Sequence, residues 1–188
     1  KVLYVEIDSA IYYNSSQVSN VNEVKSKVMS VLNTFSTSNI NKFGGRFKYS
    51  KLGQIIDGSD SSITSNITRV IIRRNMKCLL NQSAQYELCY GNAFKKNVGG
   101  FNIKSTGFTL ANQAGTLYFT DVPDATGDMG VLSVVKESSQ SNEFTVVVKS
   151  AGTIDYKKGE IIVNTVNITS TVIELSLIHI SEPTRPSI

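Results

Sequence analysis

Carboxylates are the side chains of this 188-residue sequence that come closest to forming a chemical site. Asp121, Asp124 and Asp128 fall within one short segment rich in turn-forming residues, and their oxygens could be ligands of a calcium ion. Their spacing differs from that of the calcium-binding loop, which ends in a glutamate. A solvated turn between two strands is therefore the preferred interpretation. Asp57 and Asp60 flank a glycine, where a helix end followed by an Asx turn explains both.

Nucleophiles, bases and phosphate-binding loops are equally scarce. Cys78 and Cys89 have no CxxC partner, so they are predicted to be small buried hydrophobic side chains. His179 is the only histidine, and it lies in a C-terminal segment that is set aside below. The glycine pairs 44–45 and 99–100 lack the spacing of a phosphate loop and indicate turns. The sequence therefore predicts no catalytic residue, no cofactor site and no metal site, and the protein is not expected to be an enzyme.

Composition and charge indicate an ordinary folded protein. Hydrophobic residues make up 40% of the chain and charged residues 18%, which is too apolar for a disordered tail. Nineteen Lys and Arg against 15 Asp and Glu give a net charge of +4, an excess too mild to demand a nucleic acid partner. There is no apolar run long enough to span a membrane and no leader pattern, so we expect a soluble protein that is intracellular at synthesis.

The first part of the chain switches between the periods typical of strands and of helices. The expected elements, in order, are a strand at 3–11, a helix at 21–35, an extended piece at 46–49, a brief helix after Ser50 and a strand at 67–74. Apolar residues recur there every three or four positions and predict a stripe on one side of the helix, with Val24 and Val28 on its buried face. The stripe consists of Val21, Val24, Val28, Val31 or Leu32, and Phe35. Residues 1–78 are thus predicted to form a small ferredoxin-like β-α-β-α-β unit.

Beyond residue 78 the helical period disappears. Seven short strand-like runs recur at intervals of roughly ten residues between residues 86 and 173, which is typical of a sandwich or a barrel. The last hairpin is expected to place Gly159 where the turn needs a positive φ. We therefore expect a β-rich, sandwich-like domain at 79–174, and an α+β fold for the chain.

Both ends of the sequence look unnatural. Lys1 is not an initiator methionine and a strand pattern begins at once, so we expect the chain to begin inside a longer protein. Residues 175–185, LSLIHISEPTR, look like the in-frame translation of the transposon adapter used in tagmentation sequencing libraries. Residues 175–188 are therefore predicted to be a non-native tail. The alternative is a genuine C-terminal extension.

The order of elements in the first part resembles a known family. Its pattern here consists of the strand Val2–Ile11, the helix Val21–Phe35, Phe43–Gly45, Ser50–Leu52, Ile56–Asp57 and the strand Ile67–Ile72. This arrangement is similar to the C-terminal part of the baseplate J-like family of contractile-tailed phages, and most closely to the baseplate wedge subunits of T-even-like phages. The likeness to the wedge subunits extends through GTIDYKKGEIIVN, residues 152–164.

The resemblance implies a structural virion protein without catalysis. Wedge subunits assemble in the host cytoplasm and pack into the ring around the tail hub. The expected partners are further copies of the chain, with dimer contacts inside the ring, and other wedge and tail proteins. No nucleic acid and no membrane partner is expected. The contacts that build the ring cannot be carried over residue by residue, so the resemblance names no interface residue.

Two other functions fit parts of the pattern. In an RNA-binding module of the RRM type, Tyr4, Phe43 and Phe47 would stack on bases and three basic residues would bind phosphate. These basic residues are Lys42, Arg46 and Lys48. Against this, the aromatic string follows the first helix directly, whereas its RRM counterpart lies on the third strand. The second alternative is a sugar-binding β module of an adhesin.

Overall fold

The computed structural model describes residues 2–97, 99–138 and 143–181. The described chain divides into two units, one made of residues 2–6 and 70–181 and the other of residues 7–69. Both boundaries fall inside strands, namely β1 (Tyr4–Tyr13) and β2 (Ile63–Asn75). The expected domain limits at residues 78 and 174 stay predictions, and each unit is described by itself.

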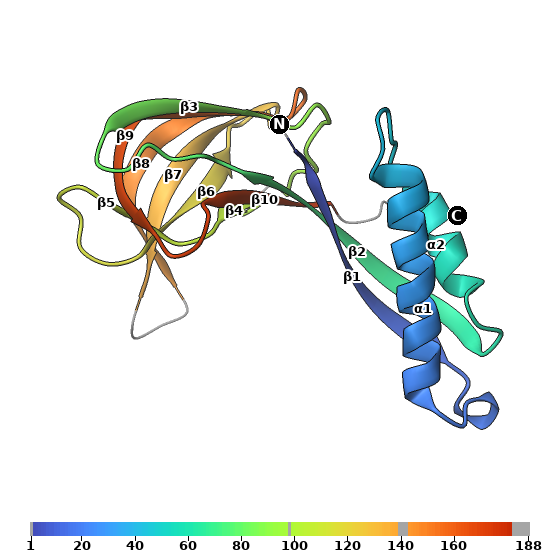
Figure 1. Cartoon of the computed structure of the whole chain (residues 1–188). Helices are drawn as coiled ribbons and strands as arrows, with labels where there is room; N and C mark the ends of the chain where they lie inside the picture. Colours follow the sequence, from blue (N-terminus) through green and yellow to red (C-terminus); the bar gives the residue numbers. More distant parts are fainter. Residues whose placement is uncertain (1, 98, 139–142, 182–188) are drawn as a thin grey trace. The chain divides into compact units, whose positions relative to one another are not determined.

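The smaller unit, residues 7–69, combines two helices with its portions of β1 and β2. These are α1 (Val21–Phe35) and α2 (Tyr49–Asp57), with a short 3₁₀ turn at Ser15–Gln17 and a π turn at Ser36–Ile40. Both helices lie on the same side of the strand pair (Figure 1). Asn20 is the N-cap of α1, because its side chain accepts a hydrogen bond from the Asn22 N–H at 3.0 Å. The helices bury Val24, Val28, Phe35, Leu52 and Ile56, which confirms the predicted burial of Val24, Val28 and Phe35. Val21, at the start of the predicted stripe, is exposed instead.

The larger unit is built from β-strands. They are β3 (Ser83–Cys89), β4 (Ile103–Ser105), β5 (Phe108–Leu110), β6 (Leu117–Pro123), β7 (Met129–Glu137), β8 (Phe144–Asp155), β9 (Glu160–Thr171) and β10 (Ser176–Ser181). Strands β5 to β9 form a closed five-stranded barrel, because consecutive strands from β5 to β9 pair antiparallel and β5 also pairs with β9. β3 adds to β9, and β4 adds to β6. The fully buried side chains inside include Phe108, Phe119, Leu117, Leu132, Ile154 and Ile161.

The predicted fold class is wrong in both halves. Residues 46–48 form no strand and Tyr49 already belongs to α2, so the first part lacks the additional strands of a ferredoxin-like sheet. β2 instead lies directly beside β1. The second part is a closed barrel rather than a sandwich, because β5 bonds to both β6 and β9. This strand has three residues, too few to show a period in the sequence.

Most of the predicted strand positions are confirmed, but their limits differ. The runs predicted at 144–148 and 152–156 are joined in one long strand, β8, which ends at Asp155 and whose pairing with β7 contains register shifts. These irregularities let one strand continue where the alternation in the sequence is interrupted. The final hairpin is confirmed, with Gly159 at φ +68° in the turn between β8 and β9.

The segment predicted to be a non-native tail contributes β10. This strand lies between β2 and β4, and Leu175 and Leu177 join the core of the larger unit. The Tyr90 hydroxyl donates to the Leu177 carbonyl oxygen at 2.7 Å. A place in the sheet says nothing of the origin of these residues, so the non-native tail stays a prediction.

Among the described helices, none combines the length and apolar character needed to cross a membrane.

Candidate functional site

The three aspartates considered as calcium ligands each have partners of their own. Asp121 is buried in β6, where its Oδ1 accepts the Ile103 N–H at 2.7 Å and its Oδ2 accepts the Tyr156 hydroxyl at 2.5 Å. Asp124 closes a turn by accepting the Gly127 N–H at 2.7 Å. Asp128 pairs with two lysine ammonium groups, at 2.7 and 3.3 Å. The predicted solvated turn therefore describes Asp124 and Asp128 but is wrong for Asp121.

The electrostatics of these groups follow from the same contacts. The Thr126 hydroxyl lowers the pKa of Asp124, and Lys157 followed by Lys96 lowers the pKa of Asp128. Burial, followed by the hydrogen bond to Asp121, raises the pKa of Tyr156 far above its ordinary value, so this phenol keeps its proton. Among the described residues, no group of three or more His, Cys, Asp or Glu side chains lies close enough to hold a metal ion.

Asp57 and Asp60 are structural, as predicted. Asp57 is the last residue of α2 and accepts the Asn66 amide at 2.6 Å. Asp60 forms the expected Asx turn, because its Oδ1 accepts the Ser62 N–H at 2.9 Å. Its Oδ2 accepts the Lys27 ammonium at 2.8 Å, and this bond is the main cause of the lowered pKa of Asp60.

The surroundings of the two thiols and of the imidazole favour their uncharged forms. Cys78 and Cys89 are free and half-buried rather than fully buried. Burial raises the pKa of Cys78 to about 11, and burial followed by Glu87 raises that of Cys89. Both thiols therefore keep their protons at neutral pH. His179 is buried with its Nε2 at 2.8 Å from the Lys95 carbonyl oxygen, and burial lowers its pKa.

The aromatic residues proposed for RNA stacking do not form an RRM-type strand. Phe43 is fully exposed and Phe47 packs edge-on against Phe35 at 6.4 Å, and neither lies in a strand. The ring of Tyr4 is covered by the Arg73 guanidinium, 4.5 Å from the ring centroid. Tyr4 lies in β1, but Phe43 and Phe47 do not join it on a strand, as base stacking in an RRM requires.

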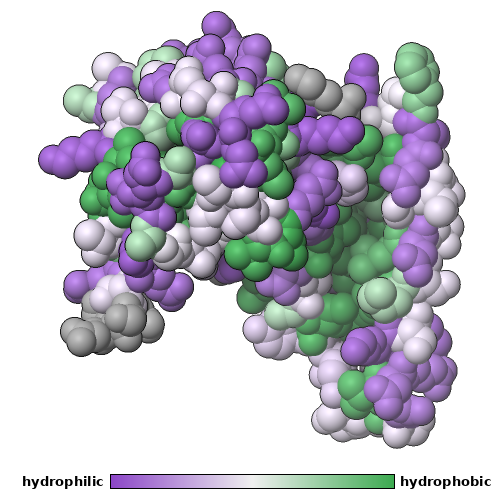
Figure 2. All heavy atoms as spheres, turned by 60° about the vertical axis from the view of Figure 1, so that its left-hand side comes forward, coloured by the Kyte–Doolittle hydropathy of each residue, from purple (hydrophilic) through white to green (hydrophobic). Residues whose placement is uncertain are grey.

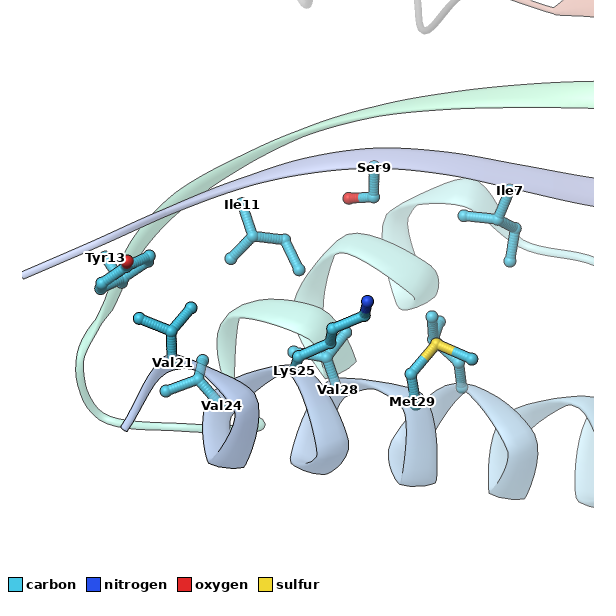
Figure 3. A pocket seen from close by; sticks show the side chains of 10 residues that line it. Ile7, Ser9, Ile11, Tyr13, Val21, Val24, Lys25, Val28 and Met29 are labelled. Carbon is cyan, nitrogen blue, oxygen red and sulfur yellow. The ribbon is translucent and has the colours of Figure 1, made fainter. Parts of the chain in front are cut away.

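A groove of about 330 Å³ in the smaller unit is a surface that the sequence did not predict. It lies between one face of β1 and one flank of α1, with side chains of both elements directed into it (Figure 3). The lining from β1 is Ile7, Ser9, Ile11 and Tyr13, and that from α1 is Val21, Val24, Lys25, Val28, Met29 and Leu32. Lys25 is the one charged residue of this set.

The groove exposes large apolar side chains to solvent. Val21 is 51% exposed and Met29 is 50% exposed, while Val24 and Val28 on the adjacent stripe of α1 are buried. Figure 2 shows that apolar side chains (green) also gather in patches elsewhere on the surface, between hydrophilic ones (purple). In the groove they stand beside a strand that has a neighbour on one side only: among the described residues, β1 pairs with β2 alone. A surface of this kind is typical of protein contacts.

Comparison with known proteins connects these residues to a phage tail. Residues 1–75 match the family model described as baseplate structural protein gp6, C-terminal domain III. A search of curated proteins found no match. The match supports a structural protein of the bacteriophage baseplate, and with it a place in the virion. It includes every residue that lines the groove.

The resemblance stated from the sequence is thereby confirmed in its coarser form, as a phage baseplate protein. The sequence named no interface residue, so the groove was missed. A signal was present, because Val21, Lys25 and Met29 recur every fourth residue beside the buried stripe.

Proposed function

We propose that this chain is a component of the baseplate wedge, and that it assembles through protein contacts into the ring around the tail hub. The chain would assemble with its partners in the host cytoplasm before it becomes part of the virion. The match of residues 1–75 to a baseplate structural domain carries the proposal. The groove and the unpaired side of β1 support it, since both lie within the matched residues.

The exposed apolar side chains give such contacts a driving force. Burying a Val or Met side chain completely contributes about 1.5–3 kcal/mol. Val21 and Met29 are half-exposed, so covering both would contribute roughly that amount together. A groove of this kind favours a protein partner, with further copies of the chain and other wedge and tail proteins as the expected ones. We expect no catalysis, no nucleic acid and no membrane partner in this role.

Sedimentation of the purified chain, alone and mixed with the tail proteins of the same phage, tests the proposal. Met29→Glu should weaken association at the groove, because a charge would have to be buried there. Leu79→Glu is the matched control, since Leu79 is 55% exposed and lies outside the groove. A chain that neither self-associates nor co-sediments with tail proteins would contradict the proposal. Salt-sensitive RNA binding, or retention on a glycan column, would support one of the two alternatives instead.

A further inference from the structure

We propose that a pocket on the outer face of the barrel binds a saccharide through one pyranose ring. The pocket has a volume of about 280 Å³ and belongs to the larger unit. It lies outside residues 1–75, which carry the proposed assembly function. The inference therefore goes beyond that function and does not depend on it.

The pocket extends over four strands of the sheet. Its lining comes mainly from β4, β6, β7 and β8, which are successive neighbours in the sheet (Figure 1). Opposite residues of paired strands share a face, and so do residues two apart in one strand. By these two rules, the side chains around the pocket form one connected series on one face. The series is Lys104, Thr120, Tyr118, Val135, Glu137 and Phe144.

This face is the outer face of the barrel. Leu117 and Phe119 alternate with Tyr118 and Thr120 along β6, and both belong to the core inside the barrel. The side chains of the series therefore point away from that core. Glu137 and Phe144 are exposed, so a ligand in solution can reach them.

Aromatic rings form the apolar part of the pocket. Phe101 and Phe144 are half-exposed, with ring centroids 6.0 Å apart and ring planes tilted by 35°. Tyr118 supplies a third ring. Phe101 has a φ of +58°, an unfavourable conformation for a bulky residue that is typical of functional sites. The exposed ring faces carry negative charge density, which suits the C–H groups on the flat side of a pyranose.

Two side chains of opposite charge line the same pocket. Lys104 offers an ammonium donor and Glu137 a carboxylate acceptor. Within the described part of the chain, neither charged group has a hydrogen-bond or ion-pair partner. A hydroxyl can accept from the ammonium and donate to the carboxylate, and both bonds would be strengthened by the charge. A ligand with several hydroxyls therefore matches both groups, whereas a purely apolar ligand matches neither.

The Thr120 hydroxyl is a further polar group of the pocket. Thr120 is 4% exposed, and its Oγ1 has no hydrogen-bond partner among the described residues. Buried hydroxyls without a partner are uncommon in folded proteins. Because Thr120 lines the pocket, a turn of its side chain about χ1 would let a ligand hydroxyl become that partner.

A pyranose ring combines the two properties that these groups select, an apolar face and a rim of hydroxyls. The volume of the pocket lies near the lower end of the range for small-molecule sites, so it has room for one ring rather than for several. Ile178 of β10 also lines the pocket. The aromatic, charged and hydroxyl groups named above all precede residue 175, so the proposed contacts need no part of the predicted non-native tail.

Saturation-transfer NMR with the full chain tests the site. The probes are the methyl pyranosides of glucose, galactose, mannose and N-acetylglucosamine, and we expect at least one to bind with millimolar affinity. Purified bacterial lipopolysaccharide is the second probe. Tighter binding of lipopolysaccharide than of any methyl pyranoside would identify a surface polysaccharide as the source of the ring, and weaker binding would identify a free sugar.

Substitutions in the pocket test its chemistry. Phe144→Ala should weaken pyranoside binding about tenfold, because one of the two exposed rings is lost. Glu137→Gln keeps the shape of the side chain but removes the charged acceptor, so it should weaken binding several-fold. Phe43→Ala is the matched control and should leave binding unchanged, since Phe43 is exposed in the smaller unit. All three positions are exposed, so the melting temperatures should change little.

Three results would overturn the proposal. They are no binding of any pyranoside or of lipopolysaccharide, binding that Phe144→Ala and Glu137→Gln leave unchanged, and binding of phenol without binding of a pyranoside. Loss of co-sedimentation with tail proteins in Phe144→Ala, without saccharide binding by the parent chain, would show that this face is a protein contact instead.

The proposed function is tested separately from this site. A chain that co-sediments with tail proteins keeps the assembly function whether or not it binds a saccharide. Saccharide binding without co-sedimentation would support the pocket and, in place of the baseplate role, the sugar-binding module of an adhesin.

Discussion

Replacement of Asp121 by alanine should be among the most damaging single changes in the larger unit. The carboxylate accepts hydrogen bonds from the Ile103 N–H, the Tyr156 hydroxyl and the Asn102 side-chain amide, the last at 2.7 Å. It thereby joins the start of β4 and the turn after β8 to β6. Asp121→Ala removes the acceptor and leaves all three donors behind.

The expected cost follows from the burial of those donors. Ile103 and Tyr156 are at most 1% exposed, so neither donor can turn to water. Each buried donor without a partner costs about 1–3 kcal/mol, which gives about 2–6 kcal/mol for the two. Tyr156→Phe removes one of the hydrogen bonds to the charged group and should cost about 1.5–3 kcal/mol.

Urea unfolding followed by circular dichroism measures both changes. We expect Asp121→Ala to lower the unfolding free energy more than Tyr156→Phe does. The double variant should cost less than the sum of the two, because the residues share one network. Additive effects, or an Asp121→Ala variant as stable as the parent chain, would refute the assignment of this carboxylate as the common acceptor.

Three further predictions concern other parts of the chain. Val28→Asp should destabilise the smaller unit by several kcal/mol because it buries an unpaired charge, whereas Ser30→Asp on the exposed side of α1 should change the melting temperature little. Gly45→Val should hinder folding, because the new Cβ would collide with a backbone carbonyl oxygen. Gly53→Ala should instead raise the free energy of unfolding by about 0.5–1 kcal/mol, since space around that position in α2 is open. Equal melting temperatures of the two glycine variants would contradict both predictions. The raised pKa of Cys78, about 11, means that folding favours the protonated thiol, so its contribution to stability is complete below pH 9 and is lost as the pH rises toward 11. Alkylation of Cys78 by iodoacetamide should accordingly speed up only in that range, and rapid reaction at pH 8 would show that the thiol is not held in this environment.

Local patterns predicted the local elements well. The helix α1 carries its own capping residue and an apolar stripe, so both its start and the burial of Val28 could be read from the sequence. The turn at Gly159 was also predictable, because its backbone conformation is one that glycine adopts easily. Each of these features depends on residues that are close in the chain.

The errors in the predicted fold arose where strand pairing decided the outcome. A piece at 46–49 has an extended appearance, yet it has no strand to pair with, and Tyr49 joins α2 instead. β5 closes the barrel because Phe108 pairs with Leu117 nearby in the sequence and also with Thr171, which is distant from it in the sequence. Closure is a property of the set of pairs, so no single run of residues reveals it.

The sequence alone predicted the apolar stripe of α1 and the likeness to phage baseplate proteins in the first part of the chain. Only the tertiary structure decided that Asp121 is a buried acceptor and that β1 has a strand neighbour on one side. It also decided that Val21 and Met29 face a groove instead of a core. The physical reason is that the spacing of hydrophobic residues along the chain shows which side chains avoid water. Which elements cover those side chains depends on contacts between distant parts of the chain.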